Sequence, residues 1–299
     1  MPRSYFLNSA DDATRMSVCY LNGVFLPLAE AQIPVLDRGF IFGDGIYEVI
    51  PVFGGRPFRL AAHLARLGQS LAAIAIPAPL DVTAWTAVLG ELILRNPQPD
   101  LSLSIQVTRG VAPRNHAAPN GGTPTVFAMA SPLATNADQA PVQVISMVDI
   151  RWQRCDIKAI SLLPNVLART AAVSAGAYEA VLFRDDFLTE GAASNVFVIS
   201  NDQIKTPPHS GYILPGITRD TVVEALANSP DAVQEVAISR AEVLQASEIW
   251  LTSSTRDLVP VSHLDGCLVG RGAPGPVFRR ISALYERFKS AELAATRQS

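Results

Sequence analysis

Apolar and polar positions alternate along several short segments of the chain, and this alternation predicts β-strands. In residues 101–108 every second residue is apolar over most of the segment, so one face of that strand is expected to be buried and the other wet. Residues 18–21 and 24–26 flank Asn22-Gly23, a dipeptide typical of a hairpin turn. Further strands are predicted at residues 46–53, 125–130, 142–147, 151–161, 179–184, 196–200 and 248–251.

Apolar residues also recur at helical spacing. Residues 60–75 carry one apolar stripe, formed by Leu60, Leu64, Leu67, Leu71 and Ile74. A second stripe of the same segment is polar, as is usual for a solvent-exposed face, and comprises Arg59, His63, Arg66 and Ser70. Other helices are predicted after Asp81 as N-cap, at residues 165–175, from the segment 214–220 to about residue 227, after the capping box of Ser239 and Glu242, and from about residue 276.

The order of these elements predicts a mixed α/β fold, because hairpins exclude a purely parallel sheet. Residues 131–141 are rich in small and polar residues and lack periodicity, so they are interpreted as a linker. This divides the chain into an N-terminal tail at 1–16, a smaller α/β domain at 17–130 and a larger domain at 142–299. At 299 residues, the length fits one large domain or two domains of ordinary size.

Composition and charge disfavour several classes of function. Apolar residues make up 48% of the chain and charged residues 17%, which allows a large core. The net charge of −3 offers no basic field for nucleic acid or anionic lipid, so a bound anion must be held by local groups. Three cysteines without metal-ligand spacing suit a reducing cytoplasm, and no metal site is expected. Neither a signal peptide nor a membrane-spanning segment is evident.

The stretch Arg151-Trp152-Gln153-Arg154-Cys155-Asp156-Ile157-Lys158 carries the most suggestive chemistry. Lys158 is flanked by Ile157 and Ala159-Ile160, in a predicted buried strand. Burial disfavours the ammonium form of a lysine, so this amine could attack a carbonyl carbon. The alternative is a lysine on an exposed strand edge, with its stem packed and its head in water.

Several weaker signals complement this lysine. Arg114 and His116 lie in a loop that can grip a carboxylate, although a solvated basic loop fits equally. Glu190 precedes a run of small residues where a flat ligand can approach, but an isolated acid is more often a turn residue. The helix start at Gly216-Ile217-Thr218 and the segment 252–255 offer N–H and hydroxyl donors for a phosphate. Together, these groups match the needs of pyridoxal phosphate.

The chain resembles the fold-type IV, class IV pyridoxal-phosphate aminotransferases, and most of all the D-amino acid (D-alanine) aminotransferases. The resemblance runs in the family's order from about residue 18 to the final helix. The matching stretches are Asp37-Arg38-Gly39-Phe40-Ile41-Phe42-Gly43-Asp44-Gly45-Ile46-Tyr47-Glu48, residues 106–110 with 113–116, the lysine stretch, Thr189-Glu190-Gly191 with Ser194-Asn195, and Gly216-Ile217-Thr218-Arg219-Asp220.

The resemblance implies a role for each site residue. Lys158 forms the Schiff base with the cofactor and moves the proton during transamination, and Glu190 pairs with the pyridine nitrogen. The phosphate is held by Arg66, Ile217, Thr218, Ser253 and Ser254. A carboxylate trap is formed by Tyr47, Arg114 and His116, the last two from the neighbouring subunit of a homodimer, with the cofactor between two α/β domains.

The same resemblance implies D-amino acids and 2-oxo acids as substrates, because the Pro-Arg-x-His loop is typical of the D-specific branch. Other class IV activities stay open: branched-chain L-amino acid or (R)-amine transamination, and aminodeoxychorismate lyase. A non-catalytic protein that binds the cofactor is the alternative outside the enzymes. The chain departs from the family pattern at four positions near the expected site: Pro164, Ala192, Ala193 and Pro215.

Overall fold

The computed structural model describes residues 17–119, 121–133 and 140–295. The chain forms two compact units, which divide between residues 134 and 135. Residues 158–161 group with the first unit, although the segments on both sides of them belong to the second. The domain boundaries predicted from sequence stay a prediction, because part of the interpreted linker, residues 134–139, lies outside the described residues and its first two residues end a strand.

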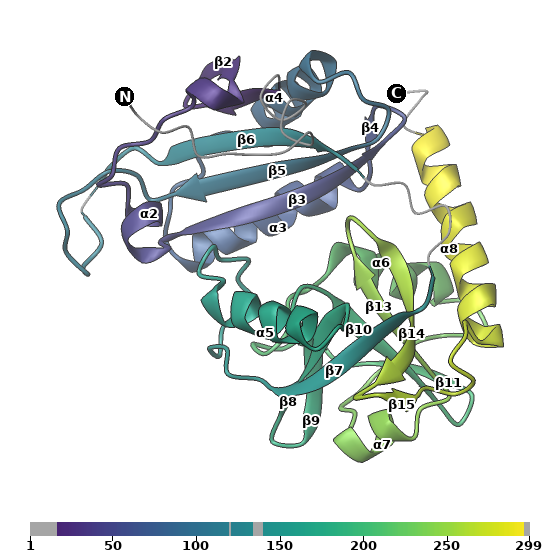
Figure 1. The fold of residues 1–299 in the computed structure, drawn as a ribbon. Helices are drawn as coiled ribbons and strands as arrows, with labels where there is room; N and C mark the ends of the chain where they lie inside the picture. Colours follow the sequence, from purple (N-terminus) through teal and green to yellow (C-terminus); the bar gives the residue numbers. More distant parts are fainter. Residues whose placement is uncertain (1–16, 120, 134–139, 296–299) are drawn as a thin grey trace. The chain divides into compact units, whose positions relative to one another are not determined.

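Within its described residues, the first unit contains a six-stranded antiparallel sheet in the order β2-β1-β6-β5-β3-β4 (Figure 1). The helix α3 packs against β3, and α4 packs against β1 and β6. The elements are β1 (Val18–Leu21), β2 (Val24–Pro27), η1 (Leu28–Glu30), α2 (Arg38–Phe42), β3 (Gly45–Phe53), β4 (Arg56–Pro57), α3 (Leu60–Ala73), α4 (Val82–Arg95), β5 (Leu101–Thr108) and β6 (Thr125–Pro132).

Three local predictions for this unit are confirmed. The hairpin turn places both Asn22 and Gly23 at positive φ, the conformation that a two-residue turn requires. Asp81 caps α4 by accepting a hydrogen bond of 2.8 Å from the Ala84 amide. The strand β5 alternates between buried and half-buried residues along most of its length, as its sequence predicts.

Glycines let α2 and the start of β3 approach β5 closely. A Cβ atom at Gly39 would overlap Cγ2 of Thr108, and one at Gly45 would lie 2.6 Å from the Val107 carbonyl oxygen. Neither position has room for a side chain. The glycines at positions 39 and 45 therefore allow the chain to pack closely against β5.

The second unit contains a mixed sheet in the order β12-β11-β10-β13-β14-β7-β8-β9 (Figure 1), to which β15 adds beside β14. Three pairs are parallel, β14 with β7, β7 with β8, and β11 with β12. The strands are β7 (Val142–Val148), β8 (Glu179–Arg184), β9 (Phe187–Gly191), β10 (Asn195–Ser200), β11 (Gln203–Thr206), β12 (Gln234–Glu235), β13 (Glu248–Ser253), β14 (Asp257–Leu264) and β15 (Cys267–Leu268). The mixed pairing confirms the predicted fold class.

Helices cover this sheet. The helix α5 (Leu163–Ser174) packs on β7 and β8, and both α6 (Ile217–Leu226) and α8 (Pro276–Ala295) pack on β13. The short α7 (Arg240–Leu244) is capped by Ser239, whose hydroxyl accepts from the Glu242 amide, as the capping box predicts. The helices described by the structure include none that is long and apolar enough to cross a membrane.

Two predictions are wrong. Residues 151–161 form no strand, since only Ala159 makes an isolated bridge, to Ile46. The polar stripe of α3 is not exposed, because His63, Arg66 and Ser70 are all buried. In both cases the partner comes from a distant element, β3 or the segment 158–161, which the local pattern cannot reveal.

Candidate active site

Lys158 lies beside the first residues of β3. The strand β4 pairs only with the far end of β3, at Val52 and Phe53, so the edge near Gly45 is open to another segment. The segment 158–160 pairs there: the Tyr47 amide donates to the Lys158 carbonyl at 2.9 Å, and the Ile160 amide donates to the Gly45 carbonyl at 3.1 Å. Backbone pairing with a long central strand therefore fixes the position of the lysine.

The Lys158 side chain is half-buried and lies over an aromatic ring. Its Nζ is 4.1 Å from the centroid of the Tyr47 ring, and its own amide donates to the Ser70 hydroxyl at 3.2 Å. The first unit brings Lys158 and Tyr47, two of the predicted site residues, into contact.

A third predicted residue, Arg66, lies below the same strand in a buried ionic cluster. Its Nε and Nη2 donate to the Glu48 carboxylate at 2.7 and 2.9 Å, and His63 Nδ1 lies 2.8 Å from Glu48 Oε2. Tyr47 and Glu48 are adjacent on β3, so their side chains point to opposite faces of the sheet. Glu48 is on the face covered by α3, among the fully buried Ile46 and Ile50.

Electrostatics keeps this cluster charged. Burial raises the pKa of Glu48, but the charge and hydrogen bonds of Arg66, with a further contribution from His63, outweigh burial and lower the pKa to about 2. Burial lowers the pKa of His63 below its ordinary value, even though Glu48 opposes this. A neutral His63 is consistent with a ring that donates Nδ1–H to the carboxylate. The phosphate-binding role predicted for Arg66 stays a prediction.

Arg114 and His116 lie together on the loop between β5 and β6. Both side chains are exposed, and both lie near the ring of Phe42: Arg114 Cζ is 5.5 Å and the His116 ring 5.4 Å from its centroid. The two predicted carboxylate-binding side chains thus share one aromatic support. This geometry fits a ligand that reaches the loop from outside.

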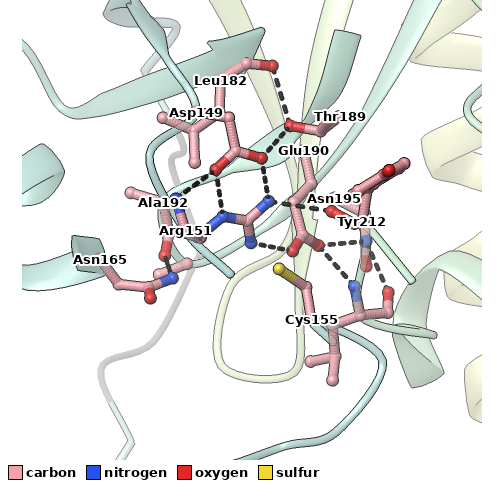
Figure 2. Close-up of polar contacts among 12 residues, drawn as sticks. Asp149, Arg151, Cys155, Asn165, Leu182, Thr189, Glu190, Ala192, Asn195 and Tyr212 are labelled. Carbon is pink, nitrogen blue, oxygen red and sulfur yellow. Dashed lines mark hydrogen bonds and ion pairs between the residues drawn. The ribbon is translucent and has the colours of Figure 1, made fainter. Parts of the chain in front are cut away.

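In the second unit, Glu190 is held by a buried arginine. Figure 2 shows the guanidinium of Arg151 between the carboxylates of Asp149 and Glu190. Its Nε and Nη2 donate to Asp149 at 2.9 Å each, and its Nη1 donates to Glu190 Oε1. Thr189 donates to Asp149 Oδ2 at 3.0 Å. Glu190 is therefore part of a buried network and not a turn residue.

This network stabilises charged groups. Burial lowers the pKa of the Arg151 guanidinium, but hydrogen bonds and charges of Asp149 and Glu190 outweigh burial and raise that pKa well above its ordinary value. Burial raises the pKa of Asp149, but Arg151 and Thr189 outweigh burial and lower it. An arginine with two carboxylate partners remains protonated under all ordinary conditions.

The second oxygen of Glu190 is also fixed. Oε2 accepts from Asn195 Nδ2 at 3.0 Å and from the Leu214 amide at 3.0 Å. Asn195 leaves no room for a side chain at Gly216, where a Cβ would overlap its Oδ1. The start of α6 and the Glu190 carboxylate are therefore packed around the same asparagine.

The four phosphate-site residues predicted in this unit lie on two neighbouring elements. Ile217 and Thr218 begin α6, and Ser253 and Ser254 lie where β13 turns toward β14. The free amide groups of a helix start and the serine hydroxyls suit an anion. Among the described residues, the buried hydroxyl of Thr252, which precedes Ser253 on β13, has no hydrogen-bond partner.

Tyr285 of α8 connects these two elements. Its hydroxyl donates to Asp257 Oδ1 at 2.8 Å and takes a hydrogen bond from Thr218. Burial raises the pKa of Tyr285 well above its ordinary value, and the charge of Asp257 acts in the same direction. Lys289 donates to Asp257 Oδ2 at 2.7 Å. The C-terminal helix thus ties the helix start to the β13–β14 hairpin.

A model of the family "amino-transferase class IV" matches residues 45–264. This chain belongs to the class IV aminotransferases.

Relatives of known sequence agree with this assignment. The chain is 39% identical over 277 residues to a D-alanine aminotransferase of Bacillus licheniformis, with 92% of this chain and 98% of the relative covered. It is 36% identical over 277 residues to a D-alanine aminotransferase of Staphylococcus haemolyticus, covering 91% and 98%.

Solved structures give the same fold. A branched-chain amino acid aminotransferase from a T.th. strain, solved with pyridoxamine 5′-phosphate, is 25% identical, with a TM-score of 0.84 over 93% of this chain and 95% of that chain. A branched-chain aminotransferase from Thermoproteus uzoniensis, 24% identical with a TM-score of 0.83 over 92% and 95%, also has this fold.

Two departures of this class IV aminotransferase from the family pattern, Ala192 and Ala193, adjoin a buried glutamate. Glu179 Oε1 accepts from the Ala193 amide at 2.6 Å and from the Ser194 hydroxyl at 2.9 Å. Burial raises the pKa of Glu179. The turn after Glu190 is therefore shaped by backbone and Ser194 contacts, without hydroxyls at positions 192 and 193.

Pro164 and Pro215 both precede helices. Pro164 lies in the first turn of α5, where proline is well tolerated because its missing amide hydrogen has no helical partner. Pro215 precedes Gly216, the N-cap of α6.

The sequence alone predicts no role in the site for Asp149, Arg151, Glu48 or His63 of this aminotransferase. The available signal is weak: Asp149 and Arg151 are two oppositely charged residues just after β7, and Glu48 is an acid within an apolar strand. Within the described residues, no group of three or more His, Cys, Asp or Glu side chains is arranged to hold a metal ion.

Proposed function

We propose that this class IV aminotransferase is a D-amino acid transaminase that uses pyridoxal phosphate and transfers the amino group of D-alanine to 2-oxoglutarate. The observation that carries the proposal is the position of Lys158, whose amine lies over the Tyr47 ring on a backbone fixed by β3. The two D-alanine aminotransferases that are 39% and 36% identical over nearly the whole chain support the choice of donor.

The buried and donor-rich groups fit this cofactor. Pyridoxal phosphate supplies an aldehyde that condenses with amines and a protonated ring that accepts electrons from the substrate. Ile217, Thr218, Ser253 and Ser254 would hold its phosphate, with the amide groups at the start of α6 and the serine hydroxyls as donors. Arg66 is proposed for the same phosphate, with its orientation set by Glu48.

Glu190 would receive the protonated ring nitrogen. Arg151, Asn195 and the Leu214 amide hold its carboxylate in one orientation. A carboxylate that is held by a guanidinium and two further donors is preorganised, so binding a cationic N–H requires no rearrangement. By orienting Glu190, the network of Asp149 and Arg151 would help to keep the ring nitrogen protonated, so that the ring can accept electrons.

Lys158 would act as the base and acid of the reaction. Its Nζ takes the proton from the substrate Cα and returns a proton at the end of the transfer. The Tyr47 ring below Nζ restricts where that amine can move. The Lys158 amine would deliver the proton from one face of the cofactor. The handedness of the amino acid would therefore depend on which side of the site holds the substrate carboxylate.

Arg114 and His116 would hold that carboxylate, together with Tyr47. We propose that the loop serves the active site of the neighbouring subunit in a homodimer. Exposed apolar side chains lie on this loop and on the segment 35–40, which bonds to the base of the loop: Val35 and Phe40 are 73% and 71% exposed, and Val111 is 51% exposed. We propose that a second copy of the chain covers these side chains.

The donor assay tests this function. Pyruvate formation from D-alanine and keto-acid formation from L-leucine are measured with 2-oxoglutarate as acceptor, for wild type and Lys158→Ala. We expect D-alanine to be used at least tenfold more efficiently and Lys158→Ala to be inactive with both donors. A preference for L-leucine would favour branched-chain transamination, the activity named for the two structural neighbours.

The state of the cysteines supports a proposal for where the protein acts. The three cysteines, Cys19, Cys155 and Cys267, are free. We propose the reducing cytoplasm as the site of action, where thiols stay reduced.

A further inference from the structure

Arg38, in the first turn of α2, contacts the loop that carries Arg114 and His116. The Arg38 side chain is buried. Its Nη1 donates to the carbonyl oxygens of Asn115, at 2.5 Å, and Ala117, at 3.5 Å, and its Nη2 donates to that of His116, at 3.3 Å. One guanidinium thus binds three consecutive carbonyl groups of an otherwise exposed loop segment.

The base of the loop is held separately. The Arg38 amide donates to the Gly110 carbonyl at 2.9 Å, the Ala112 amide donates to the Leu36 carbonyl at 3.3 Å, and Asp37 and Val111 form a bridge. These backbone contacts end before Arg114. The part of the loop with the carboxylate-binding side chains therefore depends on the guanidinium of Arg38.

Phe42, one helical turn after Arg38, completes the support. Arg38 Cζ lies 4.8 Å from the centroid of the Phe42 ring. Arg114 Cζ and the centroid of the His116 ring lie at similar distances from the same centroid, 5.5 Å and 5.4 Å. The ring attracts cations at such distances. Backbone and side chains of the loop are thus placed by two residues of the same short helix.

The charge of Arg38 is compensated by Asp44. Arg38 Nε donates to Asp44 Oδ2 at 2.7 Å, and Arg109 donates to both Asp44 oxygens at 2.8 and 3.0 Å. Burial raises the pKa of Asp44, but Arg109 and Arg38 outweigh burial and lower it, so Asp44 is ionised. With Nε bound to Asp44, the two terminal nitrogens are directed to the loop.

We propose that Arg38 is the positioning residue that sets the affinity of the Arg114–His116 loop for the substrate carboxylate. This rests on the proposed function of that loop. Arg38 acts through the loop and does not contact the substrate. A lysine cannot replace it, because a single ammonium group lacks the planar set of donors that reaches Asp44 and several carbonyls at once.

The experiment is a double-mutant cycle on the half-reaction. Stopped-flow absorbance follows the conversion of the holoenzyme by increasing D-alanine, which gives an apparent dissociation constant and a limiting rate. For Arg38→Lys we expect the dissociation constant to rise about tenfold and the limiting rate to stay within about twofold. In the background of Arg114→Ala, the same substitution is expected to change the dissociation constant less than about twofold.

Arg109→Lys is the matched control. Arg109 shares Asp44, but its other hydrogen bonds go to the carbonyls of Ile74 and Ala75 at the end of α3. The dissociation constant of the Arg109→Lys enzyme for D-alanine is expected to stay within about twofold of the wild-type value.

Three outcomes overturn the inference: an unchanged dissociation constant in Arg38→Lys, an equal rise with and without Arg114, or an equal rise in Arg109→Lys. Should wild type itself fail to react with D-alanine, the proposed function fails instead, and the two failures are thereby distinguished.

Discussion

Arg66 donates two parallel hydrogen bonds to Glu48, from Nε to Oε1 at 2.7 Å and from Nη2 to Oε2 at 2.9 Å. Both side chains are buried. The residue next to Glu48 on β3 is Tyr47, whose amide holds the Lys158 carbonyl. The ion pair below the strand therefore fixes the segment that positions the lysine above it.

Loss of the Glu48 carboxylate should destabilise the fold strongly. Glu48→Gln removes the buried negative charge that Arg66 and His63 share, so we expect a decrease of about 3 kcal/mol or more in the free energy of unfolding. Glu91→Gln, which removes an exposed pair with Arg95, should cost about 0.5 kcal/mol. Urea unfolding of both variants measures the difference, and similar costs would contradict a structural role for the buried pair.

Acid should weaken the same interaction. The pKa of Glu48 is about 2 in the folded protein and 4.5 ordinarily, so at low pH the unfolded chain binds a proton that the folded chain does not. The contribution of Glu48 is therefore complete above about pH 4.5 and is lost as the pH falls toward 2. Between about pH 6 and pH 3.5, the stability difference between wild type and Glu48→Gln should shrink by about 1.4 kcal/mol. A constant difference would show that Glu48 is not held as an ion.

His63 adds a second effect at higher pH. Its pKa is lowered in the folded protein, so below about pH 6.5 the unfolded chain gains a proton first and stability falls. Unfolding of His63→Gln, compared with wild type at pH 8 and pH 5.5, should show a stability gap that narrows in acid. A gap that widens in acid would mean that His63 is protonated when folded.

Tyr285→Phe should weaken cofactor binding without touching the cofactor. It removes the hydroxyl between Thr218 and Asp257 and leaves a buried carboxylate oxygen without that donor. We expect the dissociation constant of pyridoxal phosphate, from absorbance titration of the cofactor-free protein, to rise about tenfold. Tyr178→Phe, a half-buried tyrosine beside β8, is the control and should bind as wild type. Equal affinities of Tyr285→Phe and wild type would refute the bracing role of α8.

Thiol reagents should distinguish the cysteines. Burial raises the pKa of Cys155 to about 11, and burial also raises the pKa of Cys19, whereas Cys267 is exposed. Because the thiolate is the reactive form, alkylation at about pH 8 should modify Cys267 first and the buried pair only after unfolding. Mass spectrometry of the digested protein measures this. Early modification of Cys155 would mean that the buried network around Arg151 opens to solvent.

Local patterns in the sequence predict much of this fold. The hairpin at Asn22-Gly23, the cap at Asp81 and the alternation of β5 depend on neighbours in sequence, and these predictions are confirmed. The exposed face predicted for α3 is wrong because its partner, Glu48, comes from another strand. Interactions between distant segments are invisible to periodicity.

The candidate site shows the same limit. Resemblance to a family indicates Lys158, Glu190 and the loop of Arg114, but not the residues that orient them. Arg151 behind Glu190 and Arg38 behind the loop are recognised only from contacts across 39 and about 77 positions of the sequence. Such supporting residues follow from the folded geometry.

Borohydride reduction of the purified holoenzyme, followed by peptide mapping with mass spectrometry, tests the central claim most directly. The account predicts one pyridoxyl group per chain, attached to Nζ of Lys158 and absent from Lys158→Ala. A modification at Lys205 or Lys289 in place of Lys158, or no stable adduct at all, would contradict it.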